Sequence, residues 1–486
     1  MPLPLHKTKI VATIGPASES PEMLERLIQA GMGIARLNFS HGDFESHRAR
    51  IGRIRAAEAK VGRRVAIMAD LPGPKMRVGR IAPEPVNLTA GDPFTLTSED
   101  VVGDASRVSM SFDPLPRVVK PGDRLYLNDG LIQLVVEKAE GRDVRCRVAV
   151  GGELRSRKGL NLPGIKLGIG AFTDDDRACL EFALREGVDA VSQSFVETAD
   201  DLHAVRKAAR ERGGNPFLIA KIERLGALDH YEEILEAADG VMVARGDLGV
   251  EVPIEEMAVI QKRLIARANL AGKPVITATQ MLESMVSSRL PTRAEATDVA
   301  NAILDGTDAI MLSAESAVGR YPVESVGMLA RIAAATEPGR TTTRLEDLRT
   351  TSGQRPAWKA VEAFASVVEH ALRSVPCAAV LAPTRTGTTA RLISRFKPGV
   401  WIVALTGSHE VGQGLAFSCG VHPVEMSDEP EDWRVFAREW LQREGQEGDI
   451  AMLVAGPSAR RPDANHRLEF LRLNPTDQHP FHEIPT

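Results

Sequence analysis

Short apolar, β-branched runs recur along the first two thirds of the chain, and a helical pattern follows each of them. Helix starts between the runs carry capping residues at Ser20, Thr173 and Thr292, and helix ends carry Gly31 and Gly272. Eight strand–helix units favour a TIM barrel, with a doubly wound open sheet as the alternative. The predicted strands are Lys9–Thr13, Ile34–Asn38, Val65–Asp70, Ala190–Ser194, Phe217–Lys221, Gly240–Ala244, Val275–Thr279 and Ala309–Ser313.

The regular spacing of the predicted strands is interrupted once, between the third and the fourth strand. The stretch from Gly73 to Gly170 holds short alternating runs separated by Gly/Asp turns such as Asp129-Gly130. This alternation predicts a small β barrel or sandwich rather than a linker. We therefore expect a first barrel segment at residues 1–72, an inserted β domain at 73–170 and a second barrel segment at 171–337.

Beyond about Thr336 the pattern changes again. Polar loop sequence comes first, and helices then alternate with strands. This alternation predicts a separate α/β domain at residues 338–486. It should contain a helix near Trp358–Arg373 and strands at Ala378–Ala382, Trp401–Leu405 and Ile450–Val454.

Length and composition agree with a multidomain protein that works in the cytoplasm. A chain of 486 residues is too long for a single core. Its net charge of −5 gives no basic field for nucleic acid, and no apolar run is long enough to span a membrane. The N-terminus lacks the apolar core of a signal peptide, and the four cysteines form no CxxC pair. We expect a reducing, cytoplasmic location with no nucleic-acid or membrane partner.

Polar side chains gather where the predicted strands end, which is where a TIM barrel builds its active site. Taken alone, Lys221 and Glu223 also fit a solvated ion pair, and Asp247 also fits a turn cap. The whole set is harder to explain in this way, because carboxylates, cations and hydroxyls would meet at one rim. It comprises Arg36, Asn38, Asp70, Lys221, Glu223, Arg245, Gly246, Asp247, Thr279, Ser313 and Glu315.

The chemistry of this rim points to a metal ion and an anionic substrate. Carboxylates without histidine or cysteine suit Mg²⁺ or Mn²⁺ rather than zinc. Arginine beside such a metal suits a phosphate or carboxylate substrate. The residue pattern by itself therefore predicts a metal-dependent barrel enzyme that acts on a small anion.

Longer strings around these residues resemble the pyruvate kinase family over nearly the whole chain. The resemblance implies a barrel with an inserted lid and a C-terminal α/β domain, and the transfer of phosphate from phosphoenolpyruvate to ADP in the last step of glycolysis. The matching strings are KTKIVATIGPAS at 7–18, ARLNFSHG at 35–42, IAKIE at 219–223, MVARGDLG at 242–249, GKPVITATQMLESM at 272–285 and PTRAEATDVANAILDG at 291–306.

The resemblance also implies the principal catalytic roles. Glu223 and Asp247 would hold the divalent ion, Mg²⁺ or Mn²⁺. Arg36 would contact the transferring phosphoryl group, and Lys221 would neutralise charge on that group and on the enolate. Electrostatic stabilisation of this kind is what phosphoryl transfer mainly relies on.

Further roles follow from the same resemblance. Gly246, Asp247 and Thr279 would frame the carboxylate of phosphoenolpyruvate, and Thr279, Ser313 and Glu315 would belong to the route that protonates enolpyruvate. The nucleotide, which brings a second Mg²⁺, would meet residues beside and at the root of the inserted domain. That domain would close as a lid and exclude water. The nucleotide-binding positions are Arg77, Lys158, Asn38 and His41.

The third strand departs from the family pattern, because DLPGPK stands at 70–75 where the common form is DTKGPE. In the common form this segment, together with Asn38, Ser40 and Asp70, builds a K⁺ site. The combination of Leu71 and Lys75 resembles the K⁺-independent branch of the family, in which the lysine ammonium replaces the ion. The alternative is a solvent-facing Lys75 with K⁺ still bound.

The C-terminal domain diverges most from the family. TRTGTT at 384–389 precedes a predicted helix, so it is either a phosphate-binding loop for a phosphorylated allosteric effector or simply a helix cap. The segment AGPSARR at 455–461 lacks the glycine-rich loop of many relatives. The resemblance further suggests a homotetramer.

Two other classes of function compete with the kinase: a metal-dependent aldolase or lyase, and a non-catalytic binding relative. The inserted domain and Lys221 argue against the first. The presence of Lys221, Glu223 and Asp247 together argues against the second.

Overall fold

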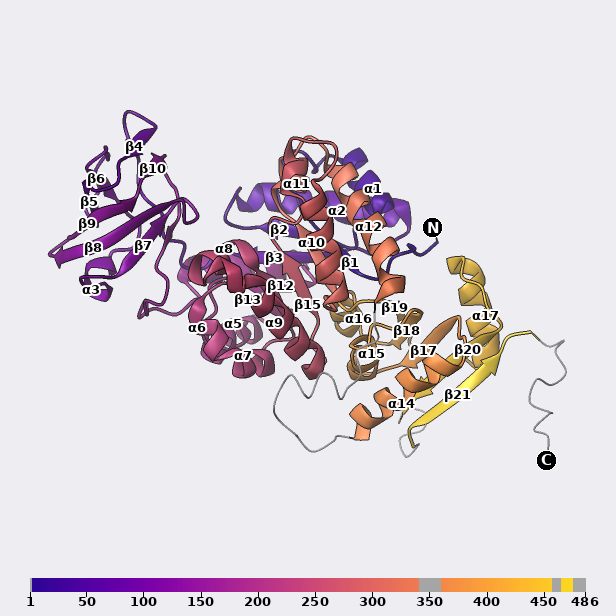
Figure 1. Ribbon diagram of the computed structural model, residues 1–486. Helices are drawn as coiled ribbons and strands as arrows, with labels where there is room; N and C mark the ends of the chain where they lie inside the picture. The colour runs from indigo at the N-terminus through magenta and orange to yellow at the C-terminus, as the bar shows by residue number, and fades with distance from the viewer. Residues whose placement is uncertain (1, 341–359, 457–464, 475–486) are drawn as a thin grey trace.

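Eight parallel strands close into a barrel in a computed structural model that describes residues 2–340, 360–456 and 465–474 (Figure 1). Around the barrel the strand order is β1-β16-β15-β14-β13-β12-β3-β2. The predicted TIM barrel is confirmed, and the open-sheet alternative is wrong. The strands are β1 (Lys9–Thr13), β2 (Ile34–Asn38), β3 (Ala66–Leu71), β12 (Ala190–Gln193), β13 (Phe217–Ile222), β14 (Gly240–Ala244), β15 (Val275–Ala278) and β16 (Ala309–Leu312).

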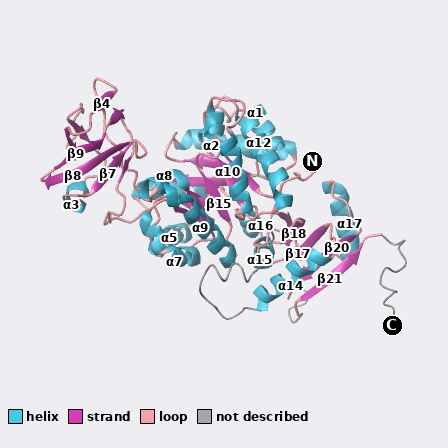
Figure 2. Cartoon of the chain, viewed as in Figure 1, coloured by secondary structure: helices cyan, strands magenta, loops and turns pink. Residues whose placement is uncertain are grey.

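Helices surround this barrel on the outside (Figure 2). The predicted helix starts are confirmed, since the Ser20 side chain accepts a hydrogen bond from the Met23 N–H and capping boxes form at Thr173 and Thr292. The helices are α1 (Pro21–Ala30), α2 (Phe44–Val61), α4 (Asp174–Arg185), α5 (Ala199–Glu211), α6 (Leu225–Asp229), α7 (Tyr231–Ala237), α8 (Arg245–Glu251), η1 (Ile254–Glu256), α9 (Met257–Ala271), η2 (Glu283–Val286), α10 (Arg293–Leu304), α11 (Ala314–Ala317), α12 (Pro322–Thr336) and η3 (Glu337–Gly339).

The register of the strands brings their carboxyl ends to one rim. Asp70 pairs with Asn38 on one side and with Ser192 on the other, and Lys221 pairs with Met242. At the opposite end the barrel is closed by Phe417 from the C-terminal part, which joins the interior apolar residues and stacks on Phe217 with ring centroids 5.2 Å apart. Only the carboxyl rim is therefore open for chemistry.

A β structure lies between β3 and β12 and stands away from the barrel in Figure 1. Six strands form one sheet in the order β11-β7-β8-β9-β5-β6, β10 pairs with β4, and the segment has its own apolar core. Its elements are β4 (Val86–Leu88), β5 (Pro93–Thr97), β6 (Arg107–Ser109), α3 (Leu115–Val118), β7 (Arg124–Leu127), β8 (Ile132–Glu140), β9 (Asp143–Val150), β10 (Gly152–Leu154) and β11 (Leu160–Asn161).

One carboxylate contacts both chain crossings between the barrel and this inserted segment. Asp176 Oδ1 accepts the Gly73 N–H at 2.9 Å where the chain leaves the barrel. Asp176 Oδ2 accepts the Thr173 N–H at 2.8 Å and the Thr173 hydroxyl at 2.7 Å where the chain returns. The two crossings are thereby held side by side.

The C-terminal part is a five-stranded sheet in the order β19-β18-β17-β20-β21, with only β21 antiparallel. Helices α14, α15 and α16 pack on one face and α17 on the other. The start of the helix predicted from Trp358, and residues 457–461, lie outside the described residues. The elements are α14 (Ala360–Ser374), β17 (Ala379–Pro383), α15 (Thr388–Ser394), β18 (Trp401–Thr406), α16 (His409–Leu415), β19 (Val421–Glu425), α17 (Trp433–Glu444), β20 (Ile450–Ala455) and β21 (Arg467–Arg472).

None of the helices in the described ranges is long and apolar enough to cross a membrane.

Candidate active site

Asp70, near the end of β3, is the centre of the rim, and only 1% of its surface is exposed. Its Oδ2 accepts two hydrogen bonds from the Arg36 guanidinium, at 2.8 Å from Nε and 2.5 Å from Nη2. Its Oδ1 accepts the Ser192 hydroxyl at 2.7 Å and lies 3.3 Å from Lys221 Nζ. One buried carboxylate therefore orients two cations that come from strands on either side of it.

Asp70 and Lys221 both keep their charges at neutral pH. Burial acts to raise the pKa of Asp70, but the cations Lys221 and Arg36 outweigh burial and hold that pKa well below its usual range. Burial acts to lower the pKa of Lys221, but the carboxylates of Asp70 and Glu223 raise it. Asp70 is therefore ionised and Lys221 protonated at neutral pH.

The Lys221 ammonium contacts three oxygen groups. They are the Ser194 hydroxyl at 2.7 Å, Glu223 Oε1 at 2.8 Å and Asp70 Oδ1 at 3.3 Å. An ammonium has three N–H donors, so these contacts match its full capacity. The side chain is therefore held at one position at the carboxyl rim of the barrel.

Glu223 and Asp247 carry the two carboxylates of the predicted metal site. Glu223 Oε2 accepts the Phe195 N–H at 2.8 Å. Burial, followed by the nearby charge of Glu223, raises the pKa of Asp247 to about 6. Among the described residues no hydrogen bond or ion pair reaches the Asp247 carboxylate, so a bound cation would supply the charge that it lacks.

The donor set fits a hard divalent cation. Groups of three or more His, Cys, Asp or Glu side chains suited to a metal do not occur in the described part of the chain. A cation at this rim would therefore take two protein carboxylates and complete its shell with water or substrate oxygens, which is the habit of Mg²⁺.

Gly246 and Thr279 meet beside this pair. The Gly246 N–H donates to Thr279 Oγ1 at 2.6 Å, and the Thr279 hydroxyl donates to the Ala278 carbonyl at 2.7 Å. Thr279 and Gln280 both have a positive φ, 70° and 53°. Two consecutive non-glycine residues in this region are strained, and such strain is concentrated at functional sites.

Ser313 and Glu315 follow β16 at the same rim. Glu315 is fully buried, with Oε1 accepting the Leu282 N–H at 3.1 Å and Oε2 accepting the Ser313 N–H at 2.7 Å. Both carboxylate oxygens are thus used to hold the loops after β15 and β16 in place. The role of these residues in protonation stays a prediction.

Lys75 is directed into the site. Its Nζ donates to Ser40 Oγ at 2.7 Å, and the Ser40 N–H donates to Asn38 Oδ1 at 3.1 Å. Burial, followed by the charge of Lys221, lowers the pKa of Lys75. Its ammonium therefore contacts one of the residues, Ser40, that were predicted for a monovalent cation.

The predicted nucleotide-binding residues lie beside this lysine and at the root of the inserted segment. Arg77 pairs with Gly159 across the two crossings, and the Val78 N–H donates to the Lys158 carbonyl at 2.9 Å. Burial, followed by the charge of Lys75, lowers the pKa of His41. Arg77 and Lys158 therefore lie where the inserted segment joins the barrel, and His41 lies on the barrel side, close enough to Lys75 for the lysine charge to act on it.

Three hydroxyls in the cluster were not predicted from the sequence. Thr13 Oγ1 accepts Arg36 Nη1 at 2.9 Å, Ser192 holds Asp70, and Ser194 holds Lys221. The spacing of the two serines was the available signal, because residues two apart on a strand share a face.

Two family models match the chain over most of its length. The first, described as the pyruvate kinase barrel domain, matches residues 5–326. The second, described as the pyruvate kinase alpha/beta domain, matches residues 362–466.

Curated proteins and a solved structure agree with these models. A pyruvate kinase of Thermococcus litoralis is 49% identical over 94% of this chain and 93% of its own length. Pyruvate kinase 2 of Synechocystis is 44% identical over 94% of this chain and 77% of its own length. The crystal structure of a pyruvate kinase from Cryptosporidium parvum has a TM-score of 0.89 and 36% identity and covers 97% of both chains.

Proposed function

This chain belongs to the pyruvate kinase family, and from that premise we propose how its own residues carry out the reaction. The enzyme transfers the phosphoryl group of phosphoenolpyruvate to ADP and gives pyruvate and ATP, the final step of glycolysis. The alternatives of an aldolase or lyase and of a non-catalytic relative are wrong. The observation that carries the mechanism is the cluster of Arg36, Asp70, Lys221 and Glu223 at the carboxyl rim.

Glu223 and Asp247 are the proposed ligands of the catalytic Mg²⁺. Their support is the pair of neighbouring carboxylates and the unusually high pKa of Asp247. When bound, a divalent ion neutralises charge on substrate oxygens and so favours transfer. Manganese suits the same oxygen ligands.

Arg36 and Lys221 are the proposed cations that bind the phosphoryl group. Asp70 orients both, so they approach the group in a fixed geometry and need no reorganisation during transfer. Lys221 then also faces the enolate oxygen as charge develops on it. The neutral rim elements, the Gly246 backbone and the Thr279 hydroxyl, frame the substrate carboxylate together with Asp247.

Protonation of enolpyruvate completes the reaction. We assign the route to the Thr279 hydroxyl with Ser313 and Glu315, because the buried Glu315 carboxylate holds the loops that carry them. Thr279 is the member whose hydroxyl lies beside Gly246.

The inserted segment, residues 73–170, is the proposed lid. Arg77 and Lys158 at its two crossings, with Asn38 and His41 on the barrel side, would bind ADP and its own Mg²⁺. Closure over the rim would exclude water from the transfer. The barrel segments at 1–72 and 171–337 and the C-terminal domain at 338–486 complete the proposed division.

Lys75 is the proposed replacement for K⁺. Its ammonium contacts Ser40, and its charge interacts electrostatically with the charges of Lys221 and Asp70. A tethered cation in this place makes a dissolved one unnecessary. The enzyme should therefore belong to the K⁺-independent branch, with Asn38, Ser40, Asp70 and Leu71 as the surrounding residues.

A coupled assay with lactate dehydrogenase tests the phosphoryl-transfer roles. With phosphoenolpyruvate, ADP and Mg²⁺ we expect turnover that EDTA abolishes. Lys221→Met should lower kcat by at least about 100-fold, as loss of one preorganised donor does elsewhere. Lys207→Met, on the exposed side of α5, is the matched control. A Lys221→Met enzyme as active as this control would refute the assignment.

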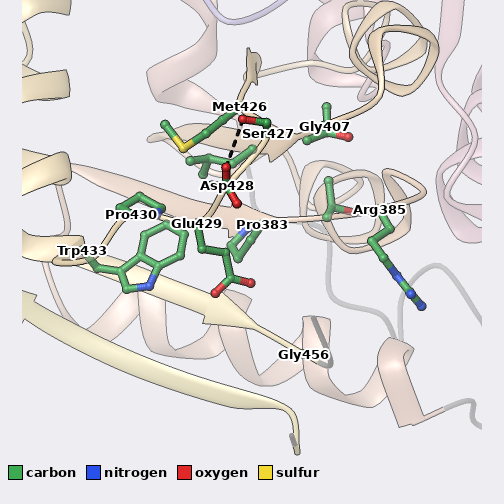
Figure 3. A pocket seen from close by; sticks show the side chains of 13 residues that line it. Pro383, Arg385, Gly407, Met426, Ser427, Asp428, Glu429, Pro430, Trp433 and Gly456 are labelled. Atoms are coloured by element: carbon green, nitrogen blue, oxygen red, sulfur yellow. Dashed lines mark hydrogen bonds between the residues drawn. The ribbon is translucent and has the colours of Figure 1, made fainter. Parts of the chain in front are cut away.

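A phosphorylated effector is the proposed ligand of the C-terminal domain. A cavity of about 150 Å³ opens at the carboxyl ends of β17 and β18, where open parallel sheets bind ligands. Figure 3 shows Trp433 beside Glu429 on one side of it and Arg385 extending on the other. In the loop after β17, Thr384 Oγ1 accepts the Gly387 N–H at 2.9 Å.

Thermal unfolding in the presence of sugar phosphates tests this ligand. We expect one phosphorylated sugar to raise the midpoint while its unphosphorylated form does not, and Arg385→Ala to abolish the rise. The absence of any shift across the phosphorylated panel would contradict the proposal.

Exposed apolar side chains support a homotetramer. They come from consecutive elements between η1 and α12, and contact between subunits there would remove their apolar surface from water. Light scattering should give four times the 52.6 kDa of one chain. These side chains are Ile254, Val259, Leu290 and Val318, which are 61–74% exposed.

A cytoplasmic location is proposed as well. Cys146, Cys179, Cys377 and Cys419 are all buried and unpaired, as expected in a reducing compartment.

A further inference from the structure

Ser194, directly after β12, makes two short hydrogen bonds although only 1% of its surface is exposed. Its hydroxyl donates to the Leu71 carbonyl at 2.7 Å. Its oxygen accepts a hydrogen bond from Lys221 Nζ, also at 2.7 Å. A hydroxyl has one hydrogen, so donation to Leu71 leaves only the lone pairs to face Lys221. The orientation of the oxygen is therefore fixed by the backbone of β3.

Ser194 differs in kind from the other two partners of Lys221. Glu223 and Asp70 are anions with further roles, since Glu223 is a proposed metal ligand and Asp70 is the partner of Arg36. Their attraction to Lys221 changes when a cation or an anionic substrate arrives. Ser194 is neutral and has no other side-chain partner among the described residues, so its contact with Lys221 persists.

The same turn contacts the root of the inserted segment. A Cβ placed on Gly73 would lie 3.1 Å from Ser194 Cβ and 2.9 Å from Phe195 Cδ2, so backbone and turn are in close contact there. Phe195 has a φ of 58°, which is unusual for an aromatic residue, and its N–H donates to Glu223. Residues 194–195 therefore touch the segment's root on one side and Lys221 and Glu223 on the other.

We propose that Ser194 is a positioning residue for phosphoryl transfer, which ties the Lys221 ammonium to the Leu71 carbonyl at the root of the lid. It keeps Lys221 Nζ at the place where charge develops, while Glu223 binds the divalent ion and Asp70 holds Arg36. The inference rests on the proposed role of Lys221. It adds an uncharged contact without which the ammonium would move toward the carboxylates.

Two variants test the proposal in the coupled assay. Ser194→Ala removes the hydroxyl, and Ser194→Cys fills the same space with a much weaker hydrogen-bonding group. We expect both to lower kcat by about 10- to 100-fold, which is the range for a hydrogen bond to a charged group. The KM for phosphoenolpyruvate should change by less than about threefold, because the contact acts on the transition state.

Ser325→Ala is the matched control. Ser325 is fully buried, its hydroxyl donates to the Tyr321 carbonyl at 2.8 Å in α12, and it is not part of the Asp70 and Lys221 cluster. Its kcat should equal that of the wild type. The thermal unfolding midpoints of the three variants should lie within a few degrees of each other.

A Ser194→Cys enzyme with kcat within twofold of the wild type would overturn the proposal, and so would a loss confined to KM. Because cysteine keeps the packing, this result decides the question even if Ser194→Ala fails to fold. An inactive wild type would instead refute the proposed function, so the two failures are distinguishable.

Discussion

At the scale of single residues, Asp70 organises the site more than any catalytic side chain does. Arg36 and Lys221 come from different strands, and both cations are nearly buried. Without the shared Asp70 carboxylate the two cations would repel each other, and the hydration that they lose on burial would be poorly compensated. The carboxylate therefore acts on stability and, in the proposed mechanism, on catalysis, since the arrangement that satisfies the buried charges is also the one proposed to receive the phosphoryl group.

Asp70→Asn should expose this double role. The amide keeps the shape but leaves the buried Arg36 without its carboxylate partner and Lys221 with Glu223 alone, so we expect a loss of about 3–5 kcal/mol in the free energy of unfolding. Activity should fall by at least about 100-fold. Denaturant unfolding and the coupled assay give the two values. Stability within about 1 kcal/mol of the wild type would contradict this account.

At the scale of elements, the carboxyl ends of short parallel strands bring the site together. Strand β3 carries Asp70 into the rim, and shortly afterwards the chain leaves the barrel at Gly73. Helix α4 begins where the chain returns, and its capping residue Asp176 binds both crossings. A helix cap thus also anchors the inserted segment, which is the proposed lid.

Asp176→Ala should weaken this anchor. We expect a loss of about 1–3 kcal/mol in unfolding free energy, from the cap and the unsatisfied Gly73 N–H. The KM for ADP should rise more than the KM for phosphoenolpyruvate, because the inserted segment carries the proposed nucleotide-binding residues Arg77 and Lys158. Asp432→Ala removes a capping carboxylate from α17, where Asp432 accepts the Arg434 and Val435 N–H groups in the C-terminal part, and serves as the control. Equal effects of both variants on the KM for ADP would count against the anchor.

The barrel strands were predictable because each is a short, largely apolar run that is buried over most of its length, and every boundary fell within one residue of the structure. Strands β19 and β21 were missed. The sequence of β19, VHPVE, is half polar, and β21, RLEFLR, alternates charged and apolar residues on an edge of the sheet. Their pairing comes from the tertiary structure rather than from local pattern.

In the candidate site, too, some residues could be predicted from the sequence and others only from the fold. Ionisable residues at strand ends, such as Lys221 and Asp70, could be identified because charges inside apolar strands are conspicuous. The supporting contacts of Ser192 and Ser194 were missed. Their spacing places both on one face of the strand, but a neutral serine is much less conspicuous than a charge, and only the closed barrel shows what each hydroxyl touches. The contact of Lys75 with Ser40 likewise depends on how the chain turns after β3.

At the scale of the whole molecule, polar contacts fix the C-terminal sheet to the base of the barrel. The buried ion pair of Lys397 and Asp308 has a distance of 2.7 Å, and Asp308 also accepts the Cys419 N–H at 2.8 Å. Lys9 Nζ donates to the Val421 carbonyl at 2.7 Å. With Phe417 closing the barrel, these contacts make barrel and sheet one unit, while the inserted segment has a core of its own.

This junction should be sensitive to acid. Burial lowers the pKa of His422 to about 3 and also lowers that of His6, from a usual value of 6.5. Below about pH 6.5 the unfolded chain therefore binds protons at these two histidines, whereas the folded chain keeps them neutral. Stability should be full above about pH 6.5 and fall as the pH drops below it.

Thermal unfolding midpoints between about pH 7.5 and pH 5 measure this effect. His422→Phe keeps an aromatic ring near Trp440 but cannot titrate, so its midpoint should fall less steeply than that of the wild type. Parallel curves for the two proteins would show that His422 does not contribute.

The proposed replacement of K⁺ by Lys75 is tested most directly by the salt dependence of activity, because this measurement joins a sequence departure, the contact with Ser40 and a function. The coupled assay is run with Mg²⁺ in KCl and in tetramethylammonium chloride at matched ionic strength, for the wild type and for Lys75→Glu. We predict equal wild-type rates in the two salts, and a Lys75→Glu enzyme that is slow in tetramethylammonium and recovers in K⁺. A large stimulation of the wild type by K⁺ would contradict the account.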